Sequence, residues 1–475
     1  MKSGKGKGGT VANKPYICHK KYRMRKAYKL EEIDQALRLN EPVGPDHEFH
    51  TDFSGMRGEF EEKIVYRSLN VSTAGGKFRY NYSTNESNKS LIFLGGMRGT
   101  GKTSELMGYA QKLSGPACFF VVFCRLDEDL NLNDMEYMDI LILQLEKLTA
   151  RLHEEKIKVN EGALESLGKW FDQQIVEINR SIKGEIGLEV GAGLEKEGIW
   201  AKLLGIFAEL KASVFASTGR TTSVRTVLKK NFLPFKEKFN EFVAEASLAV
   251  RKAGKAQDIL FVVDGLEKTM TPEIRRAIVI DESSYIRLIQ ANTIFILPIE
   301  LMKERQRLRQ LTEFVSTFPN IKIQERGGAD MPKAVARLTE FVYRRIDSSL
   351  FGDNENDELV KTMVRHCGGN PRELLRIVSY ANFHADEEKG KLDKAALDKG
   401  LRKLSRETAQ YLSAKDFEKL KELKTNNEKG LDTDYDDTID DLLEKVIIYE
   451  YNDGTYKRVN PVVELSAIYQ QRVGN

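Results

Sequence analysis

The sequence has few cysteines and no long apolar run. Its 475 residues include four cysteines, at positions 18, 118, 124 and 367, and this spacing matches neither a metal-ligand pair nor a disulfide framework. The longest uninterrupted apolar run, residues 117–124, is far shorter than the ~20 residues that span a bilayer. The basic N-terminus has no apolar segment, so we expect no signal peptide. These absences predict a cytoplasmic protein with no membrane partner.

Acidic residues are missing from the start of the chain. Residues 1–30 hold ten lysines and arginines and no acid, although the whole chain has a net charge of only +3. The remainder is therefore net acidic, and its 31% of charged residues is typical of globular domains. The basic arm either neutralises phosphates of a nucleic acid or is a solvated, disordered terminus.

From residue 90 onward, short apolar runs alternate with helical stretches. Helices are expected over residues 102–113 and 134–153, and strands over residues 91–94, 117–124, 259–263, 293–297 and 321–323. Apolar strands separated by helices are typical of a parallel sheet covered on both faces. The sequence therefore predicts an α/β fold with three layers.

About a hundred residues separate the second and third of these strands. Apolar and polar residues alternate over 186–190 and again over 208–214, which predicts an inserted β-hairpin within residues 155–232. Residues 199–207 are also compatible with a helix. The apolar face of the insertion either forms an interface or packs on its own domain.

The C-terminal third changes character. Residues 331–405 are helical in pattern, and residues 406–475 combine helices with a hairpin whose turn is Asn452, Asp453 and Gly454, typical of a winged helix. The predicted domains are an arm (1–30), an N-terminal extension (31–85), a core (86–330), a helical lid (331–405) and the winged helix (406–475). Because residues 434–444 are rich in aspartate, we expect the winged helix to contact protein rather than duplex DNA.

One glycine-rich loop has the spacing of a phosphate-binding site. Residues 96–103 match G-x-x-x-x-G-K-[ST] between an expected strand and an expected helix. Glycines let consecutive backbone N–H groups surround a phosphate, and the helix N-terminus adds positive potential. Lys102 would reach the β- and γ-phosphates, and the Thr103 hydroxyl would bind Mg²⁺. The predicted nucleotide-binding residues here are Gly96, Arg98, Gly99, Thr100, Gly101, Lys102, Thr103 and Ser104.

An acid ends the third apolar strand. Asp264 follows residues 259–263 and is predicted to hold Mg²⁺ at the carboxyl end of the sheet. Hydrolysis needs a further carboxylate to orient or deprotonate water, and position 265 is glycine. Glu267 is the candidate catalytic residue. The alternative for Glu267 is a surface glutamate that leads a helix.

Residues 367–374 combine a helix start with an unusual arginine. Asn370 is a suitable N-cap, Pro371 suits the first helical position and Glu373 completes a capping box. Arg372 lies in the first turn, where a cation opposes the helix dipole. A nearby nucleotide phosphate would explain that placement, and otherwise the stretch is a helix start alone.

Two histidines have a spacing that metals use. His47 and His50 are three residues apart, but no cysteine or third ligand is close to them in the sequence. Structural or surface roles are the favoured interpretation.

These motifs together resemble the P-loop ATPases of the AAA+/STAND superclass, over roughly residues 86–475. Residues 96–103 resemble the Walker A motif, and residues 259–267 resemble a Walker B motif of D-G-L-[DE] form. Residues 369–371 are similar to the lid signature G-x-P, and Arg372 stands where a sensor-2 arginine would. The resemblance implies ATP and Mg²⁺ as cofactors and places Lys102, Glu267 and Arg372 in the catalytic set, with Pro371 also at the nucleotide.

Two features depart from that resemblance. No polar sensor-1 residue ends the fourth expected strand, and Glu300 is only a distant substitute. No arginine finger is distinguished among Arg305, Arg307, Arg309, Arg344 and Arg345. Since a finger is worth about 10³–10⁵ in rate, an isolated protomer is expected to hydrolyse ATP slowly.

The leading hypothesis is an ATP-dependent molecular switch that signals to its own oligomer or to an effector protein, by resemblance in bacterial stress or antiviral defence. The alternative is a DNA-acting ATPase of the origin-recognition or transposition-helper type that uses the basic arm. A third possibility is a scaffold that binds nucleotide without turnover. ATPase activity separates the first two hypotheses from the third, and salt-sensitive DNA binding separates the second.

Overall fold

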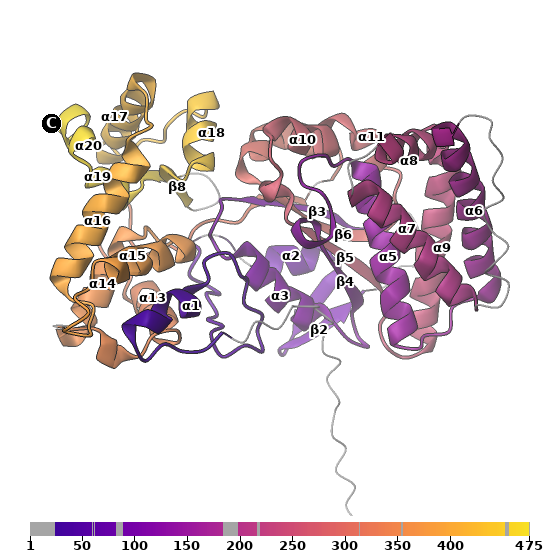
Figure 1. The fold of residues 1–475 in the computed structure, drawn as a ribbon, viewed down its shortest axis with the longest axis horizontal. Coiled ribbons are helices and arrows are strands. Elements are labelled where there is room, and N and C mark those ends of the chain that lie inside the picture. Colours follow the sequence, from indigo (N-terminus) through magenta and orange to yellow (C-terminus); the bar gives the residue numbers. More distant parts are fainter. Residues whose placement is uncertain are drawn as a thin grey trace, which may run out of the picture. The chain divides into compact units, whose positions relative to one another are not determined.

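The computed structural model describes residues 24–58, 60, 62–81, 89–183, 198–215, 219–312, 314–352, 355–451 and 456–474. The described residues divide into two compact units, and the elements of both are labelled in Figure 1. Unit 1 holds described residues in 66–91 and 109–294. Unit 2 holds those in 24–65, 92–108 and 295–474.

A five-stranded parallel sheet has the strand order β4-β5-β6-β3-β7. Its strands are β3 (Leu91–Gly96), β4 (Phe119–Arg125), β5 (Asp258–Asp264), β6 (Asn292–Pro298) and β7 (Phe314–Thr317). All seven residues of β5 and of β6 are buried, as near-continuous apolar strands of a covered parallel sheet require. The α/β class and four of the five expected strands are confirmed.

The prediction for the fifth strand was wrong. The edge strand beside β3 is β7, whereas Ile321 and Ile323 are buried among the helices of unit 2. The carbonyl of Ile323 accepts a hydrogen bond from the Met331 backbone at 2.7 Å. Strand β7 is short and half polar, so its apolar pattern is weak in the sequence. Ile321 and Ile323 have a stronger apolar pattern, but it reflects their burial in the helical core of unit 2.

Unit 1 is mainly helical outside the sheet. Its helices are α4 (Leu126–Asp129), α5 (Tyr137–Glu154), α6 (Glu161–Lys183), α7 (Ile199–Phe215), α8 (Gly219–Lys230), α9 (Phe232–Lys252), η2 (Leu266–Lys268), α10 (Pro272–Arg276), η3 (Ala277–Asp281) and α11 (Ser283–Ile286). A small antiparallel hairpin joins β1 (Val71–Ala74) to β2 (Lys77–Tyr80). Helix α2 (Glu62–Ser68) and helix α3 (Lys102–Leu113) each cross the boundary between the units.

The predicted inserted hairpin is wrong over residues 208–214, which belong to α7. Of the apolar residues that alternate there, Leu210 and Val214, four apart, are buried, whereas Ala208 and Ala212 are exposed, as on a helix with one covered face. Residues 186–190 lie outside the described part of the chain. The short apolar run could not decide between helix and strand, and tertiary packing did.

A row of aromatic rings fixes the insertion to its own unit. Phe171 of α6 contacts Phe207 and Phe235 with ring centroids 5.1 and 6.1 Å apart. Phe239 of α9 continues the row to Phe261 of β5 at 6.3 Å. These rings are fully buried, so the apolar face of the insertion packs on the parent unit.

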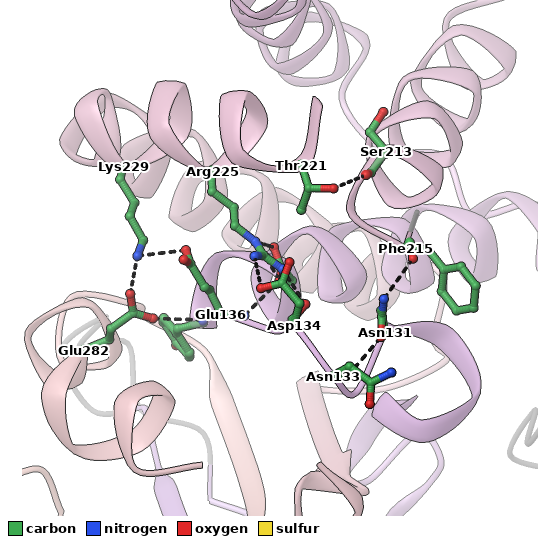
Figure 2. A network of polar contacts seen from close by, with 12 residues as sticks. Asn131, Asn133, Asp134, Glu136, Ser213, Phe215, Thr221, Arg225, Lys229 and Glu282 are labelled. Atoms are coloured by element: carbon green, nitrogen blue, oxygen red, sulfur yellow. Dashed lines mark hydrogen bonds and ion pairs between the residues drawn. The ribbon is translucent and has the colours of Figure 1, made fainter. Parts of the chain in front are cut away.

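A polar network also fastens α8 to the start of α5, as Figure 2 shows. Arg225 of α8 donates to Asp139 at 2.7 Å and to the side chain and carbonyl of Asp134 at 2.6 Å each. Lys229 pairs with Glu136 at 2.8 Å and with Glu282, which accepts from the Tyr137 backbone. The network joins the insertion to α5 and to the segment after η3.

Unit 2 is built around a helical core. Its helices are η1 (Leu30–Glu32), α1 (Ile33–Leu37), η4 (Ile299–Glu304), α12 (Arg305–Leu308), α13 (Pro332–Tyr343), η5 (Ser348–Leu350), η6 (Glu355–Asp357), α14 (Glu358–His366), α15 (Pro371–Phe383), α16 (Lys394–Ala409), α17 (Ala414–Glu428), α18 (Asp437–Glu444), α19 (Pro461–Glu464) and α20 (Ala467–Arg472). Apolar side chains from α13 to α16 form one core with Ala27, Ile33 and Phe53. The N-terminal residues are therefore part of this unit.

The end of the basic arm is folded. Ala27 exchanges backbone hydrogen bonds with Arg345 and Asp347 at 2.8 and 2.9 Å, and Lys26 pairs with Asp347 at 3.2 Å. Residues 1–23 lie outside the described part of the chain. The prediction of a disordered arm over residues 1–30 is therefore wrong from Lys26 onward, where the chain is bonded to unit 2.

The C-terminal hairpin is present at the expected place. Strands β8 (Ile448–Tyr451) and β9 (Tyr456–Val459) pair antiparallel, and the predicted turn residues Asn452, Asp453 and Gly454 lie outside the described residues. Two acids of α18 contact η4 of the same unit, because Lys303 pairs with Asp440 at 3.0 Å and with Asp437 at 3.5 Å.

Candidate functional site

The glycine-rich loop connects a strand to a helix, as its motif requires. Strand β3 ends at Gly96 and helix α3 begins at Lys102. Gly99 and Gly101 have φ angles of +81° and +87°, a region that side chains with a Cβ rarely adopt. The motif glycines are thus needed to reverse the chain between the strand and the helix.

Three consecutive N–H groups of this loop suit an anion. Within the described residues, the backbone N–H groups of Gly99, Thr100 and Gly101 donate to no protein acceptor. They precede the first turn of α3, where the helix dipole favours negative charge. The loop therefore fits a phosphate group.

Lys102 is buried against the loop itself. Its ammonium donates to the carbonyls of Gly96 and Met97 at 2.8 and 2.6 Å, and the side chain is 6% exposed. A phosphate held by the loop would therefore compete with the two carbonyls for the hydrogen bonds of the Lys102 ammonium. Without a phosphate, those hydrogen bonds hold the loop in its conformation.

The sequence motifs did not reveal Arg57, which supports the loop from outside it. This fully buried guanidinium donates to the Thr100 carbonyl at 2.8 Å, to the Pro319 carbonyl at 2.7 Å and to Glu105 of α3 at 2.8 Å. Its plane lies 4.1 Å from the centre of the Phe318 ring. Arg57 thereby joins the loop, the following helix and the end of β7. A lone arginine far upstream carried no sequence signal for this role.

The start of α15 contacts the same loop. Asn370 accepts from the backbone N–H groups of Arg372 and Glu373, which confirms it as the N-cap. Its amide also donates to the Arg98 carbonyl at 2.9 Å, and the Arg372 N–H donates to the Gly99 carbonyl at 3.3 Å. A Cβ on Gly99 would lie 2.5 Å from Asn370. Pro371 and Arg372 are therefore brought to the glycine-rich loop.

The side chain of Arg372 is directed to the N-terminal segment. Its Nε donates to the Leu39 carbonyl at 3.2 Å. The next residues of that segment contact α3, since the Val43 N–H donates to the Ser104 hydroxyl at 2.9 Å. Leu39, Val43 and Arg57 thus bring the N-terminal segment beside the loop and the start of α3, and the Ser104 hydroxyl is used in that contact.

The C-terminal hairpin contacts the loop through Met97. Its sulfur accepts from the Asn320 amide and from the Glu450 backbone N–H, each at 3.4 Å, and the Asn320 N–H donates to the Glu450 carbonyl at 3.3 Å. One short loop therefore touches the N-terminal segment, the α15 start and β8, all within unit 2.

The acidic candidates belong to unit 1. Asp264 ends β5, and Gly265, with φ +102°, starts the turn to Glu267. Both carboxylates are buried. Asp264 is in register with Arg125 of β4. Burial alone would lower the pKa of Arg125, but hydrogen bonds and charge from Asp127, together with Asp264, raise it.

Asp127 completes this acidic group. Arg125 donates to it at 2.9 and 3.0 Å, and Lys268 is also bonded to it. These cations outweigh the effect of burial and lower the pKa of Asp127. The segments after β4 and β5 are therefore joined by ion pairs of Asp127 with Arg125 and Lys268. Glu267 is buried in η2 and does not lie on an exposed helix.

The remaining candidates differ in exposure. Glu300 is buried in η4. Arg345 is 3% exposed and bonded to the carbonyls of Phe49 and Phe341, and burial lowers its pKa, so it cannot reach a second protomer. Arg344 pairs with Glu340 of α13. Among the five arginines, Arg307 and Arg309 are exposed.

The two histidines do not form a metal site. His47 accepts from the Phe49 N–H at 3.0 Å and stacks edge-on to that ring at 5.1 Å. In the described ranges no three His, Cys, Asp or Glu side chains are grouped to hold a metal ion. His47 therefore shapes the N-terminal segment.

Comparison of the chain with protein-family models and with curated proteins finds no match. Among the described helices, none combines the length and apolar character that a membrane crossing needs.

Proposed function

We propose that this chain is an ATP-dependent switch of the P-loop ATPase type, in which residues 96–104 bind the phosphates. The observation that carries the proposal is the glycine-rich loop before α3, whose N–H groups at Gly99, Thr100 and Gly101 have no protein acceptor among the described residues. Such a row of donors at a helix start favours a phosphate over any neutral ligand.

The proposed roles follow the chemistry of each group. Lys102 neutralises the β- and γ-phosphates, and Thr103 and Asp264 would hold Mg²⁺. Bound Mg²⁺ would neutralise charge that develops on the phosphate oxygens. Glu267 orients a water molecule and accepts its proton. Arg372 supplies a positive charge to the γ-phosphate in exchange for its bond to the Leu39 carbonyl.

The switch follows from what the loop touches. Asn370 and Arg372 of the proposed lid bond to carbonyls of Arg98 and Gly99, and β8 of the proposed winged helix bonds to Met97. A nucleotide that binds one arrangement of these contacts more tightly than another shifts their populations. ATP and ADP would therefore bias the lid differently and change the surface offered to an effector or a second copy.

The test combines binding, turnover and mass. The Lys102→Ala variant should lose ATP and ADP binding at least tenfold, while the Lys112→Ala variant of the same helix should bind as the parent does. Glu267→Gln should bind ATP normally and lose about 10²-fold or more of the hydrolysis rate. Mass measurement in ADP and in a non-hydrolysable ATP analogue reports assembly. A parent chain without nucleotide affinity contradicts the proposal.

A further inference from the structure

Helix α16 presents a row of cations on its exposed face. Lys399, Arg402, Lys403 and Arg406 are all exposed, whereas Leu397, Leu401 and Leu404 are buried. The spacing i, i+3, i+4, i+7 places the four cations on one stripe. We call these four residues the α16 stripe.

The stripe has no acidic partner among the described residues, where none of its four side chains forms an ion pair. Two acids of the same helix flank it: Asp398, which is exposed and forms no ion pair in the described ranges, and Glu407, which accepts from the Tyr380 hydroxyl. Several other cations of unit 2 are paired, as Arg365 is with Asp330 at 3.0 Å, whereas others such as Lys394 and Lys415 form no ion pair in the described ranges. The charge of the stripe is therefore left for a ligand.

The stripe is held on a rigid support. Gly400 lies so close to α15 that a Cβ there would meet the Tyr380 and Ala381 backbone at 2.8 Å. Lys403 lies over the Phe383 ring at 4.4 Å from its centre, although that ring is 72% exposed. Both helices, α15 and α16, are drawn as orange ribbons in Figure 1. The backbone that carries the stripe is therefore held in place, so binding has to order only the four side chains.

The chemistry favours a phosphate backbone over an acidic protein surface. Lysine is depleted at the centres of protein interfaces. The acids of α18, which a second copy would offer, already pair with Lys303 and Lys445. Seven residues of helix cover about 10 Å, which matches about three phosphates along one strand of a duplex. Arginines bind phosphate oxygens through two parallel hydrogen bonds.

We propose that the α16 stripe binds the phosphate backbone of double-stranded DNA without reading its sequence. A straight row of charges fits regularly spaced phosphates and needs no series of aromatic faces, the feature on which binding to single strands depends. This site is distinct from the N-terminal arm and from the winged helix, and it does not depend on the proposed nucleotide site.

The experiment uses the full chain and a labelled 20-base-pair DNA duplex, with fluorescence anisotropy between 50 and 200 mM salt. Arg402→Gln/Arg406→Gln removes two stripe charges. The control, Lys158→Gln/Lys252→Gln, removes two exposed charges from unit 1 that also form no ion pair in the described structure. We expect the stripe variant to bind at least tenfold more weakly at 50 mM salt, with the slope of log K against log salt reduced by about 2. The control should match the parent.

Three outcomes overturn the proposal. They are no salt-dependent duplex binding by the parent, equal loss in both variants, and tighter binding of a single strand of the same length. Unchanged melting temperatures establish that both variants are folded. Nucleotide binding should be the same in the stripe variant and the parent, so a failed ATPase proposal leaves this result interpretable.

Discussion

The side-chain amide of Asn370 donates a hydrogen bond to the Arg98 carbonyl at 2.9 Å while its oxygen caps helix α15. One residue thus contacts the glycine-rich loop and caps the start of α15. Residues 272 positions apart are joined by this bond. The contact makes the α15 start sensitive to any change of the glycine-rich loop.

Arg372 is predicted to separate ATP from ADP. Arg372→Ala should leave ADP affinity nearly intact and reduce the protection that ATP gives against proteolysis at residues 326–334, because the lost charge acts on the γ-phosphate. Arg376→Ala, one turn later and paired with Glu373, is the matched control. Equal protection by ATP in the Arg372 variant and the parent would reduce Arg372 to a helix-start residue.

Arg57 is predicted to position the loop rather than to touch nucleotide. Arg57→Lys keeps a charge beside Glu105 but cannot reach three acceptors at once. We expect nucleotide affinity to fall about tenfold and the kcat of bound ATP to change little. Arg57→Ala should also lower the free energy of unfolding by about 3–5 kcal/mol, since the buried carboxylate of Glu105 loses the cation that it pairs with.

A double substitution tests the reason for that loss. Arg57→Met/Glu105→Leu removes both buried charges and should be more stable than Arg57→Ala in urea unfolding. If the double variant is the less stable one, the hydrogen bonds to Thr100 and Pro319 rather than the ion pair dominate.

The network of Figure 2 contains a buried and a half-exposed ion pair, and their contributions to the free energy of unfolding should differ. Arg225→Ala leaves the fully buried Asp139 without its cation and should cost about 3–5 kcal/mol of unfolding free energy. Lys229→Ala, whose side chain is 30% exposed, should cost about 0–1 kcal/mol. Denaturant titrations of both variants measure the difference, and similar losses would contradict the distinction.

His47 is predicted to contribute to pH-dependent stability. Burial is the largest cause that lowers the pKa of His47 below 6.5, so the folded chain binds fewer protons there than the unfolded chain. The stabilisation is complete above pH 6.5 and is lost as the pH falls through the folded pKa. The urea midpoint of the parent should therefore fall more than that of His47→Asn between pH 7.5 and 5. Parallel curves would show that His47 does not titrate in this range.

The sequence by itself determined the elements whose signals are local. Continuous apolar runs determined β3, β4, β5 and β6, and the glycines determined a loop between a strand and a helix. Asn370 and Pro371 fixed the start of α15, because capping involves residues only a few positions apart. These features depend on backbone geometry within a few residues, which the residue types dictate.

Only the tertiary structure decided what depends on distant contacts. Residues 208–214 alternate as a strand would, but packing of α7 against α5, α6 and α8 makes them helical. Ile321 and Ile323 resemble a strand, yet they complete the helical core of unit 2, and β7 takes the sheet edge. Arg57 supports the loop from 43 residues away, and only the folded chain shows that no acid among the described residues pairs with the four cations of the α16 stripe. Burial and ion pairing are set by which segments pack together, and a local pattern does not contain that information.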